Sequence, residues 1–355
     1  MKKVLATILA LVMALSVTTM VWADDVAKIG NTGYATLKEA IEHVANGETI
    51  VLTANVNNGD GIVVASGKNF TLDFAGHTYT ITQNVVGSTG TESQCFQLLK
   101  DSTITMKDGA IVANCAGAKM IIQNYCNLTL DNMKLDATVG TNNVEYVVSN
   151  NCGNVVIKNG TTITAKTTGV AFDVYGGFGD YGDVSVTLEA GATVNGKVEV
   201  ARSSGNQNKN TLTVTGGTVN GDLAVTPSEK TEVAVTGGTF SSDVSAYAAG
   251  NTPVASNNGT YYVGAETIQN AANTLSAGQQ LKIEKGTVTI NGNTVTAGTS
   301  YTVPSRYYYY HPTTDTKADD TKGSPKTFDA GIALYVGMAL TSAAGVAFVG
   351  KKRED

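Results

Sequence analysis

The chain has 355 residues, of which 15% are charged, 39 are glycine and five are proline, and its formal net charge is −6 at pH 7. This composition favours β-structure with many tight turns and excludes a coiled coil or a helical repeat. Basic residues form no patch outside the two ends, which excludes the clustered cations that nucleic-acid binding needs.

The start of the chain has the pattern of a secretory signal peptide. Lys2 and Lys3 precede an apolar run that ends at Val21, and Ala23 stands immediately before Asp24. A short basic region, an apolar region and small residues before the cleavage position define such signals. We therefore expect cleavage between Ala23 and Asp24, with an uncleaved N-terminal membrane anchor as the alternative.

The segment YATLKEAIEHVANGETIVL, residues 34–52, predicts an amphipathic helix followed by a strand. Thr36 and Glu39 have the spacing of a capping box, and apolar residues recur on one helical face as far as Ala45. Asn46 and Gly47 then predict a turn. Such a helix can cover the open end of a stack of strands and protect its exposed edge.

Seven short segments with alternating apolar residues follow, and most of them end in a turn residue. In order they read NFTLDFAG, STITMKDG, NLTLDNM, NVVIKNG, VSVTLEAG, TLTVTGG and EVAVTGG. Six of the segments close with a glycine, namely Gly76, Gly109, Gly160, Gly191, Gly217 and Gly238. Because NLTLDNM divides the longest gap, the repeat takes about 20 to 33 residues, which is typical of solenoids.

Each segment has too few apolar residues to form a core alone, as Ile104 with Met106 and Leu128 with Leu130 illustrate. Stacked at the ~4.8 Å spacing of neighbouring strands, such segments build a continuous narrow core. We therefore predict an all-β fold, a parallel β-helix with loops of variable size and an N-terminal capping helix. An array of β-sandwiches is the alternative, because short strands with turn signals occur in both.

The pattern weakens after Gly238. Residues 268–275 predict a short helix, and the strands that follow contain Lys-Gly and Asn-Gly turns that predict β-hairpins. We expect residues 251–310 to form a β-rich C-terminal cap or a small module.

The most concentrated group of aromatic and acidic residues lies in AFDVYGGFGDYGD, a glycine-rich loop between two repeats. Aromatic rings can stack on sugars, and carboxylates can bind hydroxyl groups or Ca²⁺. We take this loop as the candidate glycan or calcium site, with a loop that only packs its own aromatics as the alternative. The candidate residues are Asp173, Tyr175, Phe178, Asp180, Tyr181 and Asp183.

The sequence offers little else for catalysis or metal binding. The arginines are Arg202, Arg306 and Arg353, and the three histidines are far apart with no nucleophile motif nearby. No catalytic residue is predicted, and we expect no cofactor other than Ca²⁺ in the candidate loop. A β-helix site assembled from separate coils would still leave little local motif, so an enzyme stays open.

Four cysteines occur within 58 residues, without zinc-ligand spacing. They are Cys95, Cys115, Cys126 and Cys152. We expect buried, unpaired thiols, with one or two disulfides as the alternative in an exported protein.

The end of the chain has the pattern of a membrane anchor. A polar linker, residues 311–323, leads to the segment from Ala330 to Val349, twenty uncharged residues that are enough to span a ~30 Å hydrocarbon core. Lys351, Lys352 and Arg353 follow and predict a cytoplasmic end, with the preceding chain outside. A buried C-terminal helix is the alternative.

A short proline motif, an apolar span and a basic tail together resemble the LPxTG-like cell-wall sorting signals of Gram-positive bacteria. Ser324, Pro325, Lys326 and Thr327 match the first four positions of the SPKTG and NPKTG variants, and Phe328 stands where the family has glycine. The resemblance implies that a sortase attacks the Thr327 carbonyl and joins it to peptidoglycan. Phe328 opposes this step, because the glycine lets the backbone pass closely through the sortase cleft.

Across nearly its whole length, the sequence resembles the right-handed parallel β-helices of the pectate-lyase-like superfamily. In particular it resembles surface proteins of gut Firmicutes with TLKEAIEHVANGETIVL starts and SPKTFDAGIALYVGMAL ends. The resemblance implies an exported, envelope-anchored β-helix that binds glycans or surfaces as an adhesin does. A polysaccharide lyase or glycoside hydrolase, or a purely structural surface component, are the alternatives.

The expected organisation follows from these elements in chain order. It comprises a signal peptide (1–23), the β-helix with its N-terminal cap (24–250), the C-terminal cap or module (251–310), the linker and sorting-like motif (311–328), a transmembrane helix (329–350) and a cytoplasmic basic tail (351–355).

Overall fold

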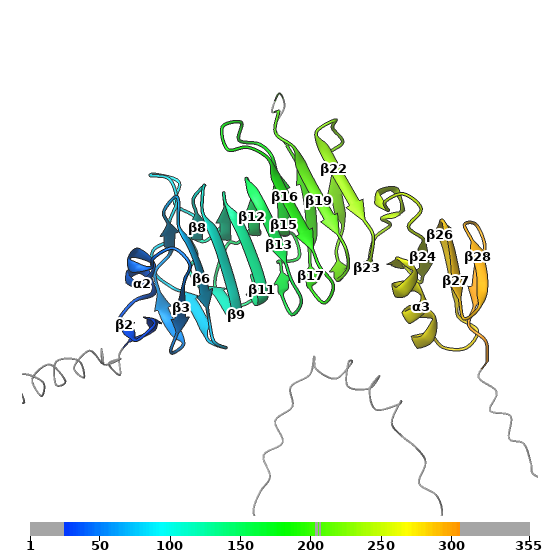
Figure 1. Ribbon diagram of the computed structural model, residues 1–355, viewed down its shortest axis with the longest axis horizontal. Coiled ribbons are helices and arrows are strands. Elements are labelled where there is room, and N and C mark those ends of the chain that lie inside the picture. The colour runs from blue at the N-terminus through cyan, green and yellow to red at the C-terminus, as the bar shows by residue number, and fades with distance from the viewer. Residues whose placement is uncertain (1–24, 203–204, 206, 306–355) are drawn as a thin grey trace, which may run out of the picture. The chain divides into compact units, whose positions relative to one another are not determined.

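The computed structural model describes residues 25–202, 205 and 207–305, and in these residues the fold is all-β with long parallel sheets (Figure 1). The expected signal peptide with its cleavage site, the sorting-like motif, the membrane span and the basic tail lie outside the described residues. Three parallel ladders of strands account for most of the structure. The chain passes through the three ladders in order, so that three consecutive strands, one in each ladder, form a coil. Each strand then pairs with its counterpart in the next coil.

The first ladder contains the seven segments that the alternating pattern identified. It consists of β3 (Glu48–Leu52), β6 (Asn69–Asp73), β9 (Thr103–Ala113), β11 (Asn127–Asp136), β13 (Gly153–Ile157), β16 (Val184–Leu188), β19 (Asn210–Val214) and β22 (Thr231–Val235). All seven segments therefore occupy the same position in successive coils.

The second and third ladders complete each coil. The second consists of β4 (Val56–Gly59), β7 (Thr78–Ile81), the C-terminal halves of β9 and β11, β14 (Thr162–Thr164), β17 (Thr193–Asn195), β20 (Thr218–Asn220) and β23 (Gly238–Phe240). The third consists of β5 (Ile62–Val64), β8 (Gln94–Leu98), β10 (Met120–Asn124), β12 (Tyr146–Asn150), β15 (Val170–Tyr175), β18 (Lys197–Ala201) and β21 (Leu223–Val225). Because neighbouring ladder strands come from successive coils and run parallel, the arrangement is compatible with a parallel β-helix and differs from a β-sandwich, whose sheets are antiparallel.

Rows of buried apolar side chains run through the first ladder from coil to coil. Leu72, Met106, Leu130, Ile157 and Leu188 are register neighbours in this order, and each is fully buried. A single segment contributes only two or three such residues, so the stacking itself creates the core. The prediction that weak repeats combine into one continuous core is confirmed.

The bend between the first and second ladders is made differently from the prediction at Gly109. Gly109 is not a turn residue, because β9 continues through it to Ala113. The position has no room for a side chain, since a Cβ atom there would lie 2.2 Å from the Cβ of Phe74. Instead Asp108 and Asn132 adopt positive φ angles of 57° and 53° in successive coils, and the Asn132 amide donates a 2.9 Å hydrogen bond to Asp108. Asn and Asp tolerate this conformation better than most residues.

The third ladder differs from the first in that its strands are buried on both faces. All five residues of β8 are buried, as are four of the five in β12. The loops that precede β8, β10 and β12 add Val85, Ala118 and Val144 to the main core and so cover the outward apolar side chains. The first strand, β5, with the exposed Val63, and the later strands β18 and β21 keep an accessible outward face.

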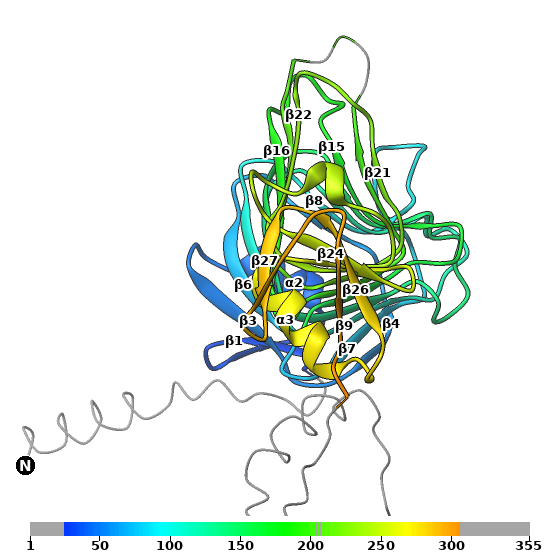
Figure 2. The same cartoon turned by 90° about the vertical axis from the view of Figure 1, so that its right-hand side faces the viewer.

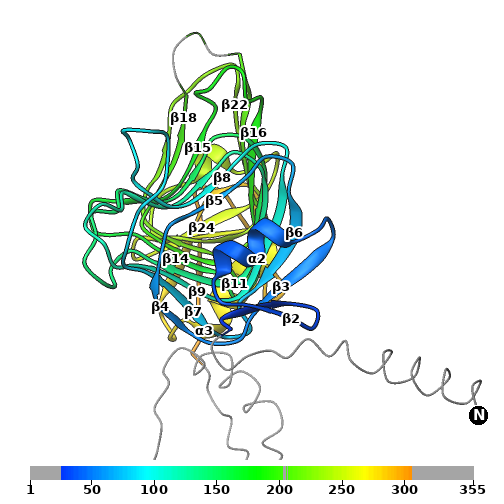
Figure 3. The same ribbon diagram turned by 90° about the vertical axis from the view of Figure 1, so that its left-hand side faces the viewer.

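A hairpin and a helix close the N-terminal end of the ladders (Figure 3). β1 (Ala27–Ile29) pairs antiparallel with both β2 (Thr32–Tyr34) and β3, which covers the edge of the first ladder. The helix α2 (Leu37–His43) begins at the predicted capping box, with both Thr36–Glu39 hydrogen bonds formed, and buries Leu37 and Ile41 in the main core. The predicted helix is therefore confirmed.

Antiparallel strands follow the last coil (Figure 2). After a short 3₁₀ turn, η1 (Ser245–Tyr247), β25 (Thr260–Val263) pairs with β23, and a second apolar core forms. Its elements are β24 (Val254–Asn257), α3 (Ala265–Thr274), β26 (Gln280–Lys285), β27 (Thr287–Ile290), β28 (Asn293–Thr296) and β29 (Ser300–Thr302).

Of the two hairpins predicted in this region, one is confirmed and the other is wrong. The Asn291-Gly292 turn joins β27 and β28 in a hairpin, as predicted, and both turn residues have positive φ angles. The Lys285-Gly286 prediction is wrong, because β26 pairs with β24 and β29 and not with β27.

Candidate functional site

The six candidate residues of the glycine-rich loop occupy two different environments. Asp173 and Tyr175 belong to β15, whereas Phe178, Asp180 and Tyr181 lie in the loop between β15 and β16. The aromatic residues form one cluster, and the carboxyl group of Asp173 is buried apart from it.

Asp173 is buried on the outward face of β15, with an exposed fraction of only 6%. The Ser149 hydroxyl donates a 3.1 Å hydrogen bond to its carboxylate, and the Asn150 backbone N–H donates another at 2.6 Å. In the next coil Glu199 is its register neighbour. Burial raises the pKa of Asp173 to about 7, although the two hydrogen bonds partly oppose this shift.

The aromatic candidates gather around Tyr125, which comes from the end of β10. The ring centroid of Tyr125 lies 4.8 Å from that of Tyr181 and 5.7 Å from that of Phe178, and Tyr175 lies 5.7 Å from Phe178. These separations are those of favourable aromatic pairs. We call Tyr125, Tyr175, Phe178 and Tyr181 the aromatic cluster.

Polar contacts hold the loop of the aromatic cluster to the coils. The Cys152 thiol donates a hydrogen bond to the Tyr181 carbonyl, and the Asn208 amide donates one to the Phe178 carbonyl at 2.8 Å. The Lys100 ammonium lies 5.8 Å from the centroid of the Tyr181 ring. The loop backbone is therefore fixed while the Phe178 and Tyr181 side chains both stay 39% exposed.

The carboxylates of the loop do not converge. Asp183 accepts a 2.8 Å hydrogen bond from the Lys209 backbone N–H, Asp180 is exposed, and Asp173 is buried in β15. In the part of the chain that the structure describes, no group of three or more His, Cys, Asp or Glu side chains could hold a metal ion. The described residues thus give no support to calcium binding by this loop.

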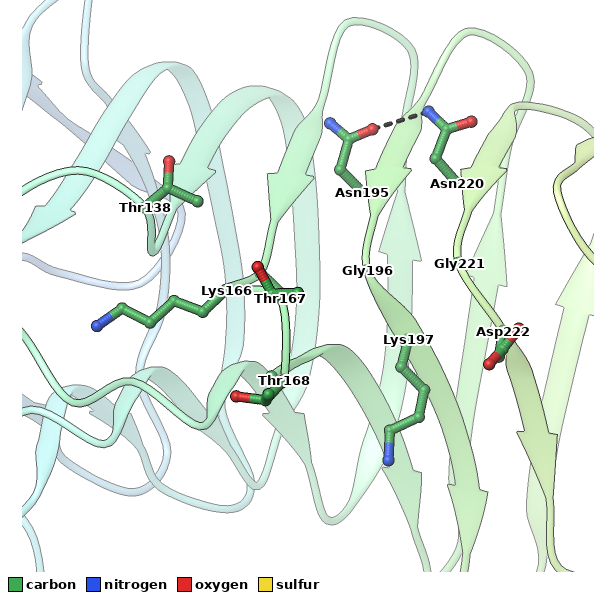
Figure 4. Close-up of a pocket in the computed structure, with 12 residues that line it drawn as sticks. Thr138, Lys166, Thr167, Thr168, Asn195, Gly196, Lys197, Asn220, Gly221 and Asp222 are labelled. Carbon is green, nitrogen blue, oxygen red and sulfur yellow. Dashed lines mark hydrogen bonds between the residues drawn. The ribbon is translucent and has the colours of Figure 1, made fainter.

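Sequence reasoning missed a polar pocket of about 560 Å³ at the corner between the second and third ladders (Figure 4). A repeated Thr-Val-Asn-Gly motif, residues 193–196 and 218–221, forms this corner in two successive coils. The 25-residue spacing of the motif was the signal that could have revealed it. The pocket is lined by Thr138, Ala165, Lys166, Thr167, Thr168, Gly169, Asn195, Gly196, Lys197, Asn220, Gly221 and Asp222.

The two asparagines of the motif form a ladder along one side of the pocket (Figure 4). The Asn220 amide donates a 2.8 Å hydrogen bond to Asn195, whose own amide donates to Thr164 at 3.2 Å. Gly196 and Gly221 let the coils approach closely, because a Cβ on Gly221 would lie 2.1 Å from the Gly196 carbonyl oxygen. At these two positions the corner therefore has no side chain that would fill the pocket.

The residues that line this pocket include two lysines and one aspartate, and Glu199 beside the pocket supplies a second carboxylate. The Lys166 ammonium donates a hydrogen bond to the Asn142 carbonyl, and the Lys197 ammonium pairs with Glu199. With Asp222 included, cations and carboxylates balance around the pocket. Such a mixture of amides, hydroxyls and balanced charges suits a ligand rich in hydroxyl groups.

The four cysteines are free in the structure, and two of them, Cys95 and Cys126, are buried. A hydrogen bond between the Cys95 and Cys115 thiols lowers the pKa of Cys115 to about 7, and the same bond together with burial raises the pKa of Cys95. Cys152 instead donates its hydrogen bond to the Tyr181 carbonyl in the loop of the aromatic cluster. The cysteines are therefore not equivalent in reactivity.

Compared with known proteins, the chain matches no protein family, no curated protein sequence and no solved structure. Within residues 25–202, 205 and 207–305, no helix is long and apolar enough to cross a membrane.

Proposed function

We propose that the chain is an exported, envelope-anchored surface protein that binds carbohydrate on a right-handed parallel β-helix. One observation carries this proposal: Phe178 and Tyr181 are the exposed Phe and Tyr side chains of the described residues, and they stand side by side in a fixed loop. Exposed aromatic rings beside polar groups are typical of sites that bind the apolar faces of sugars.

The proposed location derives from the two ends of the chain. A signal peptide cleaved between Ala23 and Asp24 would export the protein, and the apolar span at residues 329–350 would retain it. The β-rich part would then face outward, with peptidoglycan as a covalent partner if a sortase acts at Thr327. Protease treatment of intact cells should release the β-rich part, whereas its recovery only from the cytosol would contradict this location.

Mass spectrometry of the envelope-bound protein separates the two forms of anchoring. A chain that ends at Thr327 would show sortase transfer, and a chain that continues through Phe328 to Asp355 would show retention by the membrane span alone.

Carbohydrate binding is tested on a glycan array with the full-length chain in detergent. Wild type is expected to bind at least one polysaccharide, and a Phe178→Ala/Tyr181→Ala variant should bind it at least tenfold more weakly, which corresponds to about 1.4 kcal/mol. Val63→Ala is the matched control, because Val63 is 43% exposed on the same ladder, four strands from β15. No binding to any glycan would overturn the proposal and favour a purely structural role.

A second candidate function is a polysaccharide lyase or glycoside hydrolase on the same scaffold. The pKa of about 7 at Asp173 favours it, because Glu199 is its register neighbour and paired carboxyl groups with different environments serve as acid and base. Incubation with the polysaccharides that bind should then yield new reducing ends or unsaturated products. The absence of products together with retained binding would exclude this function.

A further inference from the structure

The partly exposed outward face of β18 connects the pocket to the aromatic cluster, whereas β15 is buried up to its last residue, Tyr175. Along β18, Val198 and Val200 are buried, so Lys197, Glu199 and Ala201 alternate toward the outside. Asp173 and Tyr175 of β15 are the register neighbours of Glu199 and Ala201. Both sites therefore lie on the same side of the third ladder.

The two sites occupy opposite ends of these strands. Lys197, the first residue of β18, lines the pocket, and it is the register neighbour of Val170 at the start of β15. Tyr175, the last residue of β15, packs against Phe178 in the aromatic cluster. Five steps along a strand separate the two ends, which amounts to about 16 Å.

Polar groups continue across the interval between the two sites. Lys197 pairs with Glu199, Glu199 is in register with Asp173, and Asp173 accepts a hydrogen bond from Ser149. Burial raises the pKa of Tyr125, and the nearby Tyr181 and Asp173 raise it further. Lys197 and Glu199 are thus the partly exposed polar side chains between the pocket and the aromatic cluster, whereas Asp173 and Ser149 are buried.

We infer that one glycan chain lies along the partly exposed outward face of β18, with one sugar on the aromatic cluster and another in the pocket. This inference rests on the proposed carbohydrate binding and specifies its ligand. Because Lys166 and Lys197 are balanced by Asp222 and Glu199, the pocket selects a neutral, hydroxyl-rich polysaccharide over an acidic one. A mono- or disaccharide is too short to reach both ends of a strand.

Occupation of both sites by one chain has a measurable consequence. When two sites are joined through one ligand, the second binding event is intramolecular, and affinity rises by about 10- to 100-fold or more once the ligand spans both sites. Affinity should therefore rise abruptly with chain length and not gradually.

The experiment titrates the full-length protein with xylo-, cello- and manno-oligosaccharides of two to ten units, and with galacturono-oligosaccharides as the acidic comparison. One neutral series should show the abrupt rise. An Asn220→Ala/Thr168→Ala variant should lose the rise and keep the short-chain affinity, because both changes lie in the pocket. Lys158→Ala, an exposed change on the first ladder, is the matched control and should behave as wild type.

The outcomes separate this inference from the function on which it rests. Length-independent affinity, a pocket variant equal to Lys158→Ala, or a preference for the acidic series would overturn the inference and leave carbohydrate binding intact. Failure of wild type to bind any of the three neutral series would also overturn the inference, and failure to bind any glycan on the array would overturn carbohydrate binding as well.

Discussion

The Cys152 thiol lies 2.6 Å from the backbone carbonyl oxygen of Tyr181 and donates a hydrogen bond to it. Cys152 follows β12, whereas Tyr181 belongs to the loop after β15, so the bond joins successive coils. It holds the loop of the aromatic cluster against the coils while the Tyr181 ring stays exposed.

Replacing Cys152 should therefore weaken carbohydrate binding without unfolding the protein. Cys152→Ala removes the donor, and loss of one hydrogen bond of about 1 kcal/mol predicts about a fivefold lower affinity for the polysaccharide that wild type binds. Cys152→Ser keeps a donor and should retain most of the affinity. Equal affinities for both variants in isothermal titration calorimetry would show that this bond does not position the loop.

The buried carboxyl of Asp173 predicts a pH-dependent stability. Its pKa is about 7 in the folded protein and near 3.9 in an unfolded chain, so the folded state binds an extra proton between these values. The free energy of unfolding should consequently fall as pH rises from about 4 to 7, by on the order of 4 kcal/mol for this group alone.

The comparison with Asp173→Asn isolates this contribution. Asparagine does not titrate and still offers an oxygen to the Asn150 N–H, so the difference between wild type and variant in urea unfolding should vary with pH over this window. A difference that is constant from pH 4 to 7 would show that Asp173 titrates in the ordinary range.

Cys115 should be the most reactive of the four thiols near neutral pH. Its pKa of about 7 makes roughly half of it thiolate at pH 7, against about 1% at the ordinary value of 9. Because the bond from Cys95 is the main cause, Cys95→Ala should slow alkylation of Cys115 by iodoacetamide on the order of 50-fold, with Cys126→Ala as the control. The labelling is measured by mass spectrometry. An unchanged rate in Cys95→Ala would contradict the hydrogen bond between the two thiols.

The stacked core predicts unequal effects for neighbouring positions of one strand. Leu130 is fully buried between Met106 and Ile157, so Leu130→Ala should lower the free energy of unfolding by about 2–5 kcal/mol. Thr129 lies on the opposite face of β11, and Thr129→Ala should change it by less than about 0.5 kcal/mol. Similar losses from both changes would mean that β11 is not packed in this register.

The first ladder could be predicted from the sequence because its strands have one buried and one accessible face. Alternating residues such as Leu128 and Leu130 make that asymmetry visible in a single segment. The third ladder could not be recognised in the same way, since loops cover its outward side and β8, QCFQL, is buried at every position. Alternation disappears wherever both faces of a strand are covered.

The sequence predicts the candidate site only where its residues are close together in the chain. Tyr175, Phe178 and Tyr181 stand within seven residues, and the structure does bring their rings together. Tyr125 joins them from β10, and this proximity depends on how the coils stack, which no local pattern encodes. The acidic residues of the same segment are separated, because Asp173 points into a buried network.

Hydrogen exchange measured with and without the bound polysaccharide shows where on the protein the carbohydrate binds. If carbohydrate binds along β18, added polysaccharide should slow exchange in residues 176–183 and at the corner of Gly196 and Gly221. Residues 254–303, which form the second core, should exchange as before. Protection confined to the second core, with none in the loop of the aromatic cluster, would contradict carbohydrate binding at the aromatic cluster and the pocket.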